Sequence, residues 1–132
     1  MMTAASDSLS PSVAAARRVL VVEDHEDMRD ALVEILRLEG YQVSWASDGR
    51  QALAEAKGQR PDVILLDLMM PEMNGWQFRA EQVLDPDLAA VPVIVMSAYA
   101  SDIDAVAMLP KPFLIEDMLA MVRRVVRPSS EG

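Results

Sequence analysis

Two short apolar runs in this chain are each followed directly by acidic residues. The run Val-Leu-Val-Val at 19–22 leads into Glu23 and Asp24, and the run Val-Ile-Leu-Leu at 63–66 leads into Asp67. Short runs that are apolar throughout are typical of strands buried on both faces of a parallel sheet. The carboxyl ends of such strands share one edge, where open α/β folds bind ligands. We therefore expect these three carboxylates to lie together at one edge of a sheet.

The rest of the chain alternates strand patterns with helical patterns. Strands are predicted at 18–23, 41–46, 62–67, 92–97 and 105–109, and helices at 26–39, 50–57, 76–84 and 114–126. This alternation implies right-handed crossovers and an α/β fold with a doubly wound, five-stranded parallel sheet. We expect one domain over 17–127, between a flexible leader at 1–16 and a flexible tail at 128–132.

One crossover departs from this pattern. Only seven residues, 98–104, separate the fourth predicted strand from the fifth. A parallel crossover usually needs about a dozen residues or more. We therefore expect the fourth helix of the fold to be shortened or missing. The alternative is that the fifth strand pairs differently with the sheet.

Composition narrows the class of protein. No apolar run approaches the roughly 18 residues of a membrane helix, and the N-terminus lacks a secretory signal. The chain has no cysteine, which excludes disulfides and thiolate metal sites. We expect a cytoplasmic protein. The net charge of −9 argues against nucleic-acid binding, which relies on basic patches.

A lysine is expected at the same edge of the predicted sheet as the three acids. Lys111 lies between two prolines, directly after the fifth predicted strand. Carboxylates that are crowded together repel one another unless a cation lies among them. Three acids with a lysine beside them therefore indicate a divalent ion and a phosphoryl group as ligands. The alternative, that strand-end acids are merely solvated loop residues, would suit one such acid better than three.

Four stretches of the chain carry a resemblance to a known family. They are Val-Leu-Val-Val-Glu-Asp-His-Glu-Asp-Met-Arg at 19–29, Asp-Val-Ile-Leu-Leu-Asp-Leu-Met-Met-Pro-Glu-Met-Asn-Gly at 62–75, Pro-Val-Ile-Val-Met-Ser-Ala at 92–98 and Leu-Pro-Lys-Pro-Phe at 109–113. In this order, each at a strand end, they resemble the receiver domain of two-component response regulators. The resemblance covers residues 18–127 and implies a flavodoxin-like receiver fold.

The resemblance also implies a role for each residue of the site. Asp67 is the expected phosphoacceptor, with the hydroxyl of Ser97 and the ammonium of Lys111 against the phosphoryl oxygens. Mg²⁺ is the expected cofactor, and the ligands implied for it are Asp24, Asp67, the backbone carbonyl of Met69 and, through a water, Glu23. In the family the peptide bond after the lysine is cis, and a proline at that position tolerates this conformation. A metal-ligand role for His25 is disfavoured, because that position begins the first helix.

Two features depart from the family pattern. Met108 stands where many receivers carry a switch aromatic on the fifth strand. Met69 and Tyr99 occupy the two positions that tune phosphoryl lifetime, and neither side chain can orient water as a carboxylate or amide would. We therefore expect slow hydrolysis of the phosphorylated form.

The expected function is that of a phosphoacceptor receiver, stand-alone or from a hybrid kinase. It would take phosphoryl from a sensor histidine kinase or phosphotransfer protein and signal by binding a downstream protein, since only a short tail follows residue 127. It would not be an enzyme, beyond promoting its own phosphorylation and slow dephosphorylation. One alternative is a docking module that works without phosphorylation. Another is a phosphatase, which Met69 disfavours because such enzymes commonly carry a second aspartate at that position.

Overall fold

The protein folds around a parallel sheet of five strands. The computed structural model describes residues 17–69, 73–97 and 107–126. The strand order is β2-β1-β3-β4-β5. The strands are β1 (Arg18–Val22), β2 (Gln42–Ala46), β3 (Val63–Asp67), β4 (Val93–Ser97) and β5 (Ala107–Pro110), and the helices are α3 (Glu26–Leu38), α4 (Gly49–Gly58), α5 (Gly75–Leu84) and α6 (Ile115–Val126). The prediction of a doubly wound α/β fold is confirmed.

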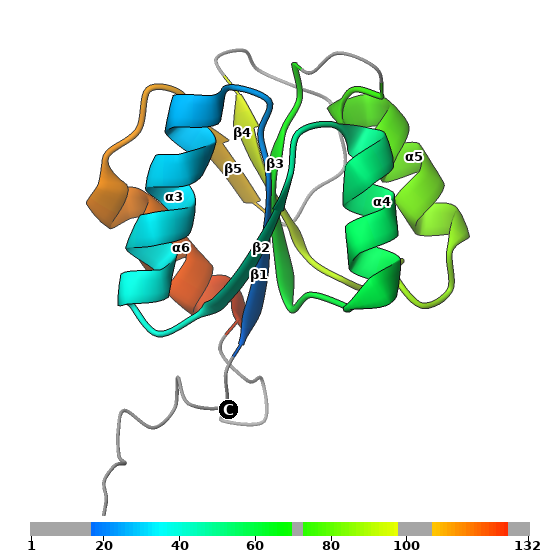
Figure 1. Ribbon diagram of the computed structural model, residues 1–132, viewed down its shortest axis with the longest axis horizontal. Coiled ribbons are helices and arrows are strands. Elements are labelled where there is room, and N and C mark those ends of the chain that lie inside the picture. Colours follow the sequence, from blue (N-terminus) through cyan, green and yellow to red (C-terminus); the bar gives the residue numbers. More distant parts are fainter. Residues whose placement is uncertain (1–16, 70–72, 98–106, 127–132) are drawn as a thin grey trace, which may run out of the picture.

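Helices cover both faces of this sheet. Figure 1 shows α3 and α6 on one face and α4 and α5 on the other. Each face has its own cluster of buried residues. One cluster includes Leu32 of α3 and Met118 of α6, and the other includes Ala52 of α4 and Phe78 of α5. The central strand β3 is buried along its whole length, which explains why its sequence is apolar until Asp67.

The ends of the elements match the prediction or differ from it by at most two residues. The largest difference is at β5, which begins at Ala107 and ends at Pro110. The alternative that this strand pairs differently is wrong, because β5 pairs in parallel with β4, with Ala107 opposite Ile94. The four described helices fit a shortened fourth helix of the family fold, while the link itself, residues 98–106, lies outside the described residues.

Three helices begin with side-chain caps at the ligand-binding edge of the sheet. His25 caps α3 and Asp48 caps α4. Asn74 and Gln77 form a reciprocal capping box on α5. These caps satisfy amide groups that a helix start leaves without partners. They fix where each helix begins relative to the strand before it.

One helical position is occupied by a buried charge. Arg29 of α3 is only 8% exposed, and its guanidinium lies 4.0 Å from the centre of the Trp45 ring. The same group donates to Ser47 Oγ at 2.9 Å and pairs with Asp30 at 3.2 Å. A stacked and hydrogen-bonded guanidinium tolerates burial that a bare charge would not.

None of the helices in the described part of the chain is long and apolar enough to cross a membrane.

Candidate functional site

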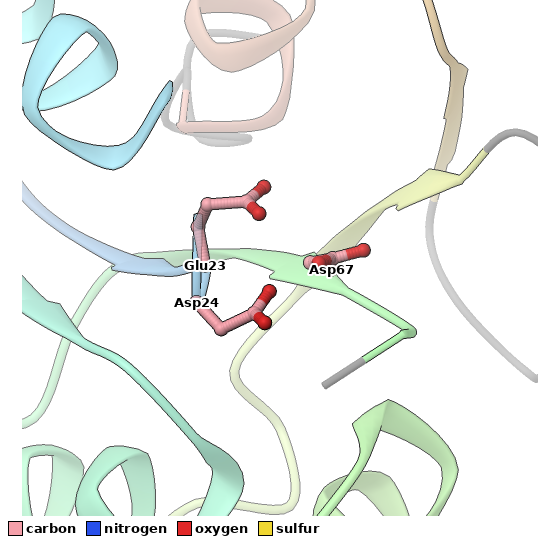
Figure 2. A group of neighbouring side chains, drawn as sticks. All are labelled: Glu23, Asp24 and Asp67. Carbon is pink, nitrogen blue, oxygen red and sulfur yellow. The ribbon is translucent and has the colours of Figure 1, made fainter. Parts of the chain in front are cut away.

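The three predicted acids meet at the carboxyl edge of the sheet. Asp67 is the last residue of β3, and Glu23 and Asp24 directly follow β1, the neighbouring strand. Each offers a carboxylate oxygen, and these oxygens all lie within 4.8 Å of one another. Figure 2 shows the three side chains at the ends of the two strands. The predicted clustering of carboxylates is therefore present.

These acids differ in their exposure to solvent. Glu23 is 1% exposed and Asp67 is 4% exposed, whereas Asp24 is exposed. The site consequently combines two buried carboxylates with one that faces solvent. A cation entering from solvent would meet Asp24 first and could keep part of its water shell there.

Lys111 reaches this cluster from the end of β5. Its Nζ lies 3.1 Å from Glu23 Oε1 and 3.6 Å from Asp67 Oδ1. The lysine side chain is 23% exposed, so it is largely withdrawn from solvent beside the two buried acids. The Lys111–Pro112 peptide bond is cis, as the resemblance implied. One ammonium therefore faces two buried carboxylates.

The burial of Asp67 and the charges around it shift the pKa of its carboxyl. Burial raises the pKa of its carboxyl, and the nearby Glu23 carboxylate raises it further. The Lys111 ammonium and a hydrogen bond from the Met69 backbone N–H, at 3.2 Å, lower that pKa in opposition. The balance leaves the pKa of Asp67 raised to about 7. Additional positive charge would stabilise the ionised form of Asp67, which is the property expected of a cation site.

Backbone amides also orient the two buried acids. The N–H of His25 donates to Glu23 Oε2 at 3.2 Å. The imidazole Nδ1 of His25 accepts from the Met28 N–H at 3.4 Å, as the cap of α3. The group of potential metal ligands in the described residues consists of the three acids and does not include His25. The helix-start interpretation of His25 agrees with this arrangement.

The remaining predicted residues lie at the same edge. Ser97 is the last residue of β4 and is paired with Pro110, the residue before Lys111. Met69 lies two residues after Asp67, and its side chain is 58% exposed. Met108, by contrast, is partly buried against the core on the α4 and α5 face. Tyr99 lies outside the described residues.

Two glycines, Gly49 and Gly75, contact residues that follow Asp67, and the sequence alone had not singled them out as functional residues. The N–H of Gly75 donates to the Leu68 carbonyl at 3.1 Å, and the N–H of Gly49 donates to the Met73 carbonyl at 2.9 Å. The signal in the sequence was the position of each glycine, immediately after a capping residue.

Comparison with known proteins agrees with this geometry. The sequence pattern of the response regulator receiver domain family matches residues 19–123 of this chain. The chain is 37% identical over 126 residues to the sensory transduction protein RegX3 of Mycolicibacterium smegmatis, covering 86% of this chain and 52% of that protein. It is 41% identical over 119 residues to the transcriptional regulatory protein PrrA of Mycobacterium leprae, covering 83% and 50%. The chain thus spans about half the length of these curated relatives.

Solved structures show the same fold. The chemotaxis response regulator CheY4 of Vibrio cholerae superposes with a TM-score of 0.77 at 32% identity, covering 83% of this chain and 98% of that one. The receiver domain of the sensor histidine kinase PA1611 of Pseudomonas aeruginosa gives a TM-score of 0.79 at 28% identity, covering 84% and 98%, and that structure has a magnesium ion coordinated in its active-site cleft. The family match and the shared flavodoxin-like architecture show that this chain belongs to the response regulator receiver domains.

Proposed function

We propose that this receiver domain accepts a phosphoryl group on Asp67 from a phosphohistidine of a sensor kinase or phosphotransfer protein. The observation that carries the proposal is the meeting of Glu23, Asp24 and Asp67 within 4.8 Å, with Lys111 against the two buried acids. Solvated acids would not need to be buried beside one another. Burying Glu23 and Asp67 side by side costs the fold electrostatic energy, and a role in phosphoryl transfer explains why that cost is kept.

The donor set suits Mg²⁺. All candidate ligands are oxygens, and Mg²⁺ prefers oxygen ligands with one or two protein carboxylates and several waters. Asp24, Asp67 and the Met69 carbonyl would be direct ligands, and Glu23 would act through a bound water. When bound, the ion would screen the repulsion between the Asp67 carboxylate and the incoming phosphoryl oxygens.

The transfer itself uses Asp67 as a nucleophile. A carboxylate oxygen of Asp67 forms the new bond to phosphorus as the phosphorus–nitrogen bond of the donor histidine breaks. The electron pair of that bond stays with the imidazole, which takes a proton from solvent. Lys111 would then pair with a phosphoryl oxygen, and the hydroxyl of Ser97 would donate to another.

The fate of the phosphorylated form depends on residues around Asp67. Hydrolysis needs a water held in line with the carboxyl–phosphorus bond. The exposed thioether of Met69 cannot orient such a water, so the phosphorylated form should be long-lived. We propose that it signals by binding a downstream protein. The function is that of a phosphoacceptor and not of a turnover enzyme, and the site is proposed to act in the cytoplasm.

Intact mass spectrometry tests the proposal. The protein would be incubated with a small phosphodonor and Mg²⁺, beside Asp67→Asn and the matched control Asp87→Asn, an exposed acid on the loop after α5. Wild type and Asp87→Asn should each gain one phosphate that hydroxylamine removes. Asp67→Asn should gain none. Equal labelling of all three proteins would refute the assignment, and no labelling of any would favour a docking module that works without phosphorylation.

A further inference from the structure

Helices α4 and α5 both begin with a glycine, at Gly49 and Gly75. Glycine is a poorer helix former than alanine by about 1 kcal/mol in helix interiors, so its use here needs a reason. Backbone conformation does not supply one. Among the described glycines, Gly40 is the one with a positive φ, at 100°. The reason for glycine at the two helix starts must therefore be space.

At Gly75 that space is taken by the acceptor segment. A Cβ added there would lie 2.7 Å from the Cα of Leu68, 2.7 Å from its Cδ2 and 3.0 Å from the carbonyl oxygen of Asp67. Two of these atoms belong to the backbone, so rotation of a side chain cannot relieve the clash. The start of α5 is thus in direct contact with the backbone that carries the phosphoacceptor.

Gly49 makes an equivalent contact with Met73, six residues after Asp67. A Cβ there would lie 2.6 Å from the carbonyl oxygen of Met73 and 2.7 Å from its Cγ. Met73 immediately precedes Asn74, the cap of α5. The start of α4 therefore contacts the residue that leads into the cap of α5.

A third glycine shows that these contacts are specific to their positions. Gly58, the last residue of α4, has nothing within 4 Å of an added Cβ. Alanine at that position would meet open space. The chain therefore contains a glycine-to-alanine control in the same helix as Gly49.

We propose that Gly75 and Gly49 are positioning residues for the metal site: they let the starts of α5 and α4 pack against Leu68 and Met73, so that the backbone after Asp67 presents the Met69 carbonyl to the ion. This inference rests on the proposed function. Mg²⁺ demands near-ideal octahedral geometry, with ligands at about 2.0–2.1 Å. An added methyl group must displace Leu68 or Met73, and displacements on the order of 1 Å are costly to such sites. Neither glycine is among the residues proposed to bind the ion or the phosphoryl group.

Calorimetric titration of Mg²⁺ into the metal-free protein tests this role. Gly75→Ala, Gly49→Ala and Gly58→Ala would be compared with wild type, and urea unfolding in EDTA would establish that each variant is folded. Gly75→Ala should raise the Mg²⁺ dissociation constant about tenfold or more, in the range seen when supporting residues of metal sites are changed. Gly49→Ala should raise it about threefold or more, and Gly58→Ala by less than about twofold.

The outcomes separate this inference from the function on which it rests. A purely structural role would lower the free energy of unfolding and leave the dissociation constant of the folded protein unchanged, and that result would overturn the proposal. If Gly75→Ala does not fold, Gly49→Ala decides the matter by the same criterion. If wild type itself bound no Mg²⁺, the metal site and its positioning residues would both be refuted.

Discussion

The ammonium of Lys111 lies 3.1 Å from Glu23 Oε1, although 88 residues separate the two in sequence. Glu23 is 1% exposed, so solvent screens this ion pair only weakly. Lys111 also lies 3.6 Å from Asp67 Oδ1. In the metal-free protein Lys111 therefore supplies the positive charge that the two buried acids require. Removing this lysine should have two opposite effects, one on stability and one on Mg²⁺ binding.

The first prediction concerns that lysine. Lys111→Met should lower the free energy of unfolding of the metal-free protein at neutral pH, on the order of 1–3 kcal/mol, because two buried carboxylates lose their counter-ion. The same variant should bind Mg²⁺ more tightly, because the ion no longer competes with the ammonium. Urea unfolding and Mg²⁺ titration measure the two effects. Lys57→Met, at an exposed position of α4, is the control, and equal destabilisation of both variants would contradict the account.

The second prediction ranks two acids. Asp24→Asn should weaken Mg²⁺ binding more than Glu23→Gln, because Asp24 is proposed as a direct ligand and Glu23 is already engaged by Lys111 and the His25 N–H. The fluorescence of Trp76, at the start of α5, can follow the titration. Trp45→Phe would remove the background emission of the second tryptophan. A greater loss of Mg²⁺ affinity in Glu23→Gln than in Asp24→Asn would mean that Glu23 is the direct ligand and that Asp24 acts through water.

The third prediction concerns pH. The pKa of Asp67 is raised to about 7 in the folded protein, against about 3.9 in an unfolded chain. Between these values the folded state keeps a proton that the unfolded state has lost, so stability falls as pH rises from about 4 to about 7 and then levels off. Without metal, Asp67→Asn should therefore be more stable than wild type at pH 8 and similar near pH 4. Urea unfolding across that range in EDTA measures the difference, and parallel profiles for the two proteins would contradict the raised pKa.

The fourth prediction concerns the lifetime of the phosphorylated form. Met69→Asn should accelerate loss of the phosphate severalfold, because an amide can orient a water that the thioether cannot. The side chain is 58% exposed, so the substitution should leave the fold intact. Met69→Leu, which cannot orient water either, should behave as wild type. The decay of the phosphorylated mass with time gives both rates, and identical decay in all three proteins would show that this position does not control hydrolysis.

Much of the fold could be predicted because its strands are buried on both faces. Apolar runs that stop at Asp67 and at Glu23 marked both the strands and the edge where the site lies. The start of β5 was less predictable, because the two residues before it in the sequence, Ala105 and Val106, are also apolar. The burial of Arg29 on α3 could not be foreseen, since it depends on Trp45 of β2, a contact that no local pattern encodes.

The site was predictable in its members but not in its internal contacts. Residue types at strand ends indicated which carboxylates would meet. That Glu23 would be the closest partner of Lys111, and that Asp67 would carry a raised pKa, depended on burial and on distances set by the sheet. The space that Gly49 leaves for Met73, and Gly75 for Leu68, was likewise visible only once the chain was folded.

The central claim is that Asp67 itself carries the phosphoryl group, and chemical trapping tests it most directly. Borohydride reduces an aspartyl phosphate to homoserine, which marks the residue permanently for peptide mass spectrometry. After treatment with phosphodonor and Mg²⁺, we predict homoserine at position 67 and aspartate unchanged at position 24. Homoserine at another aspartate, or none in a protein that has gained a phosphate, would contradict the account.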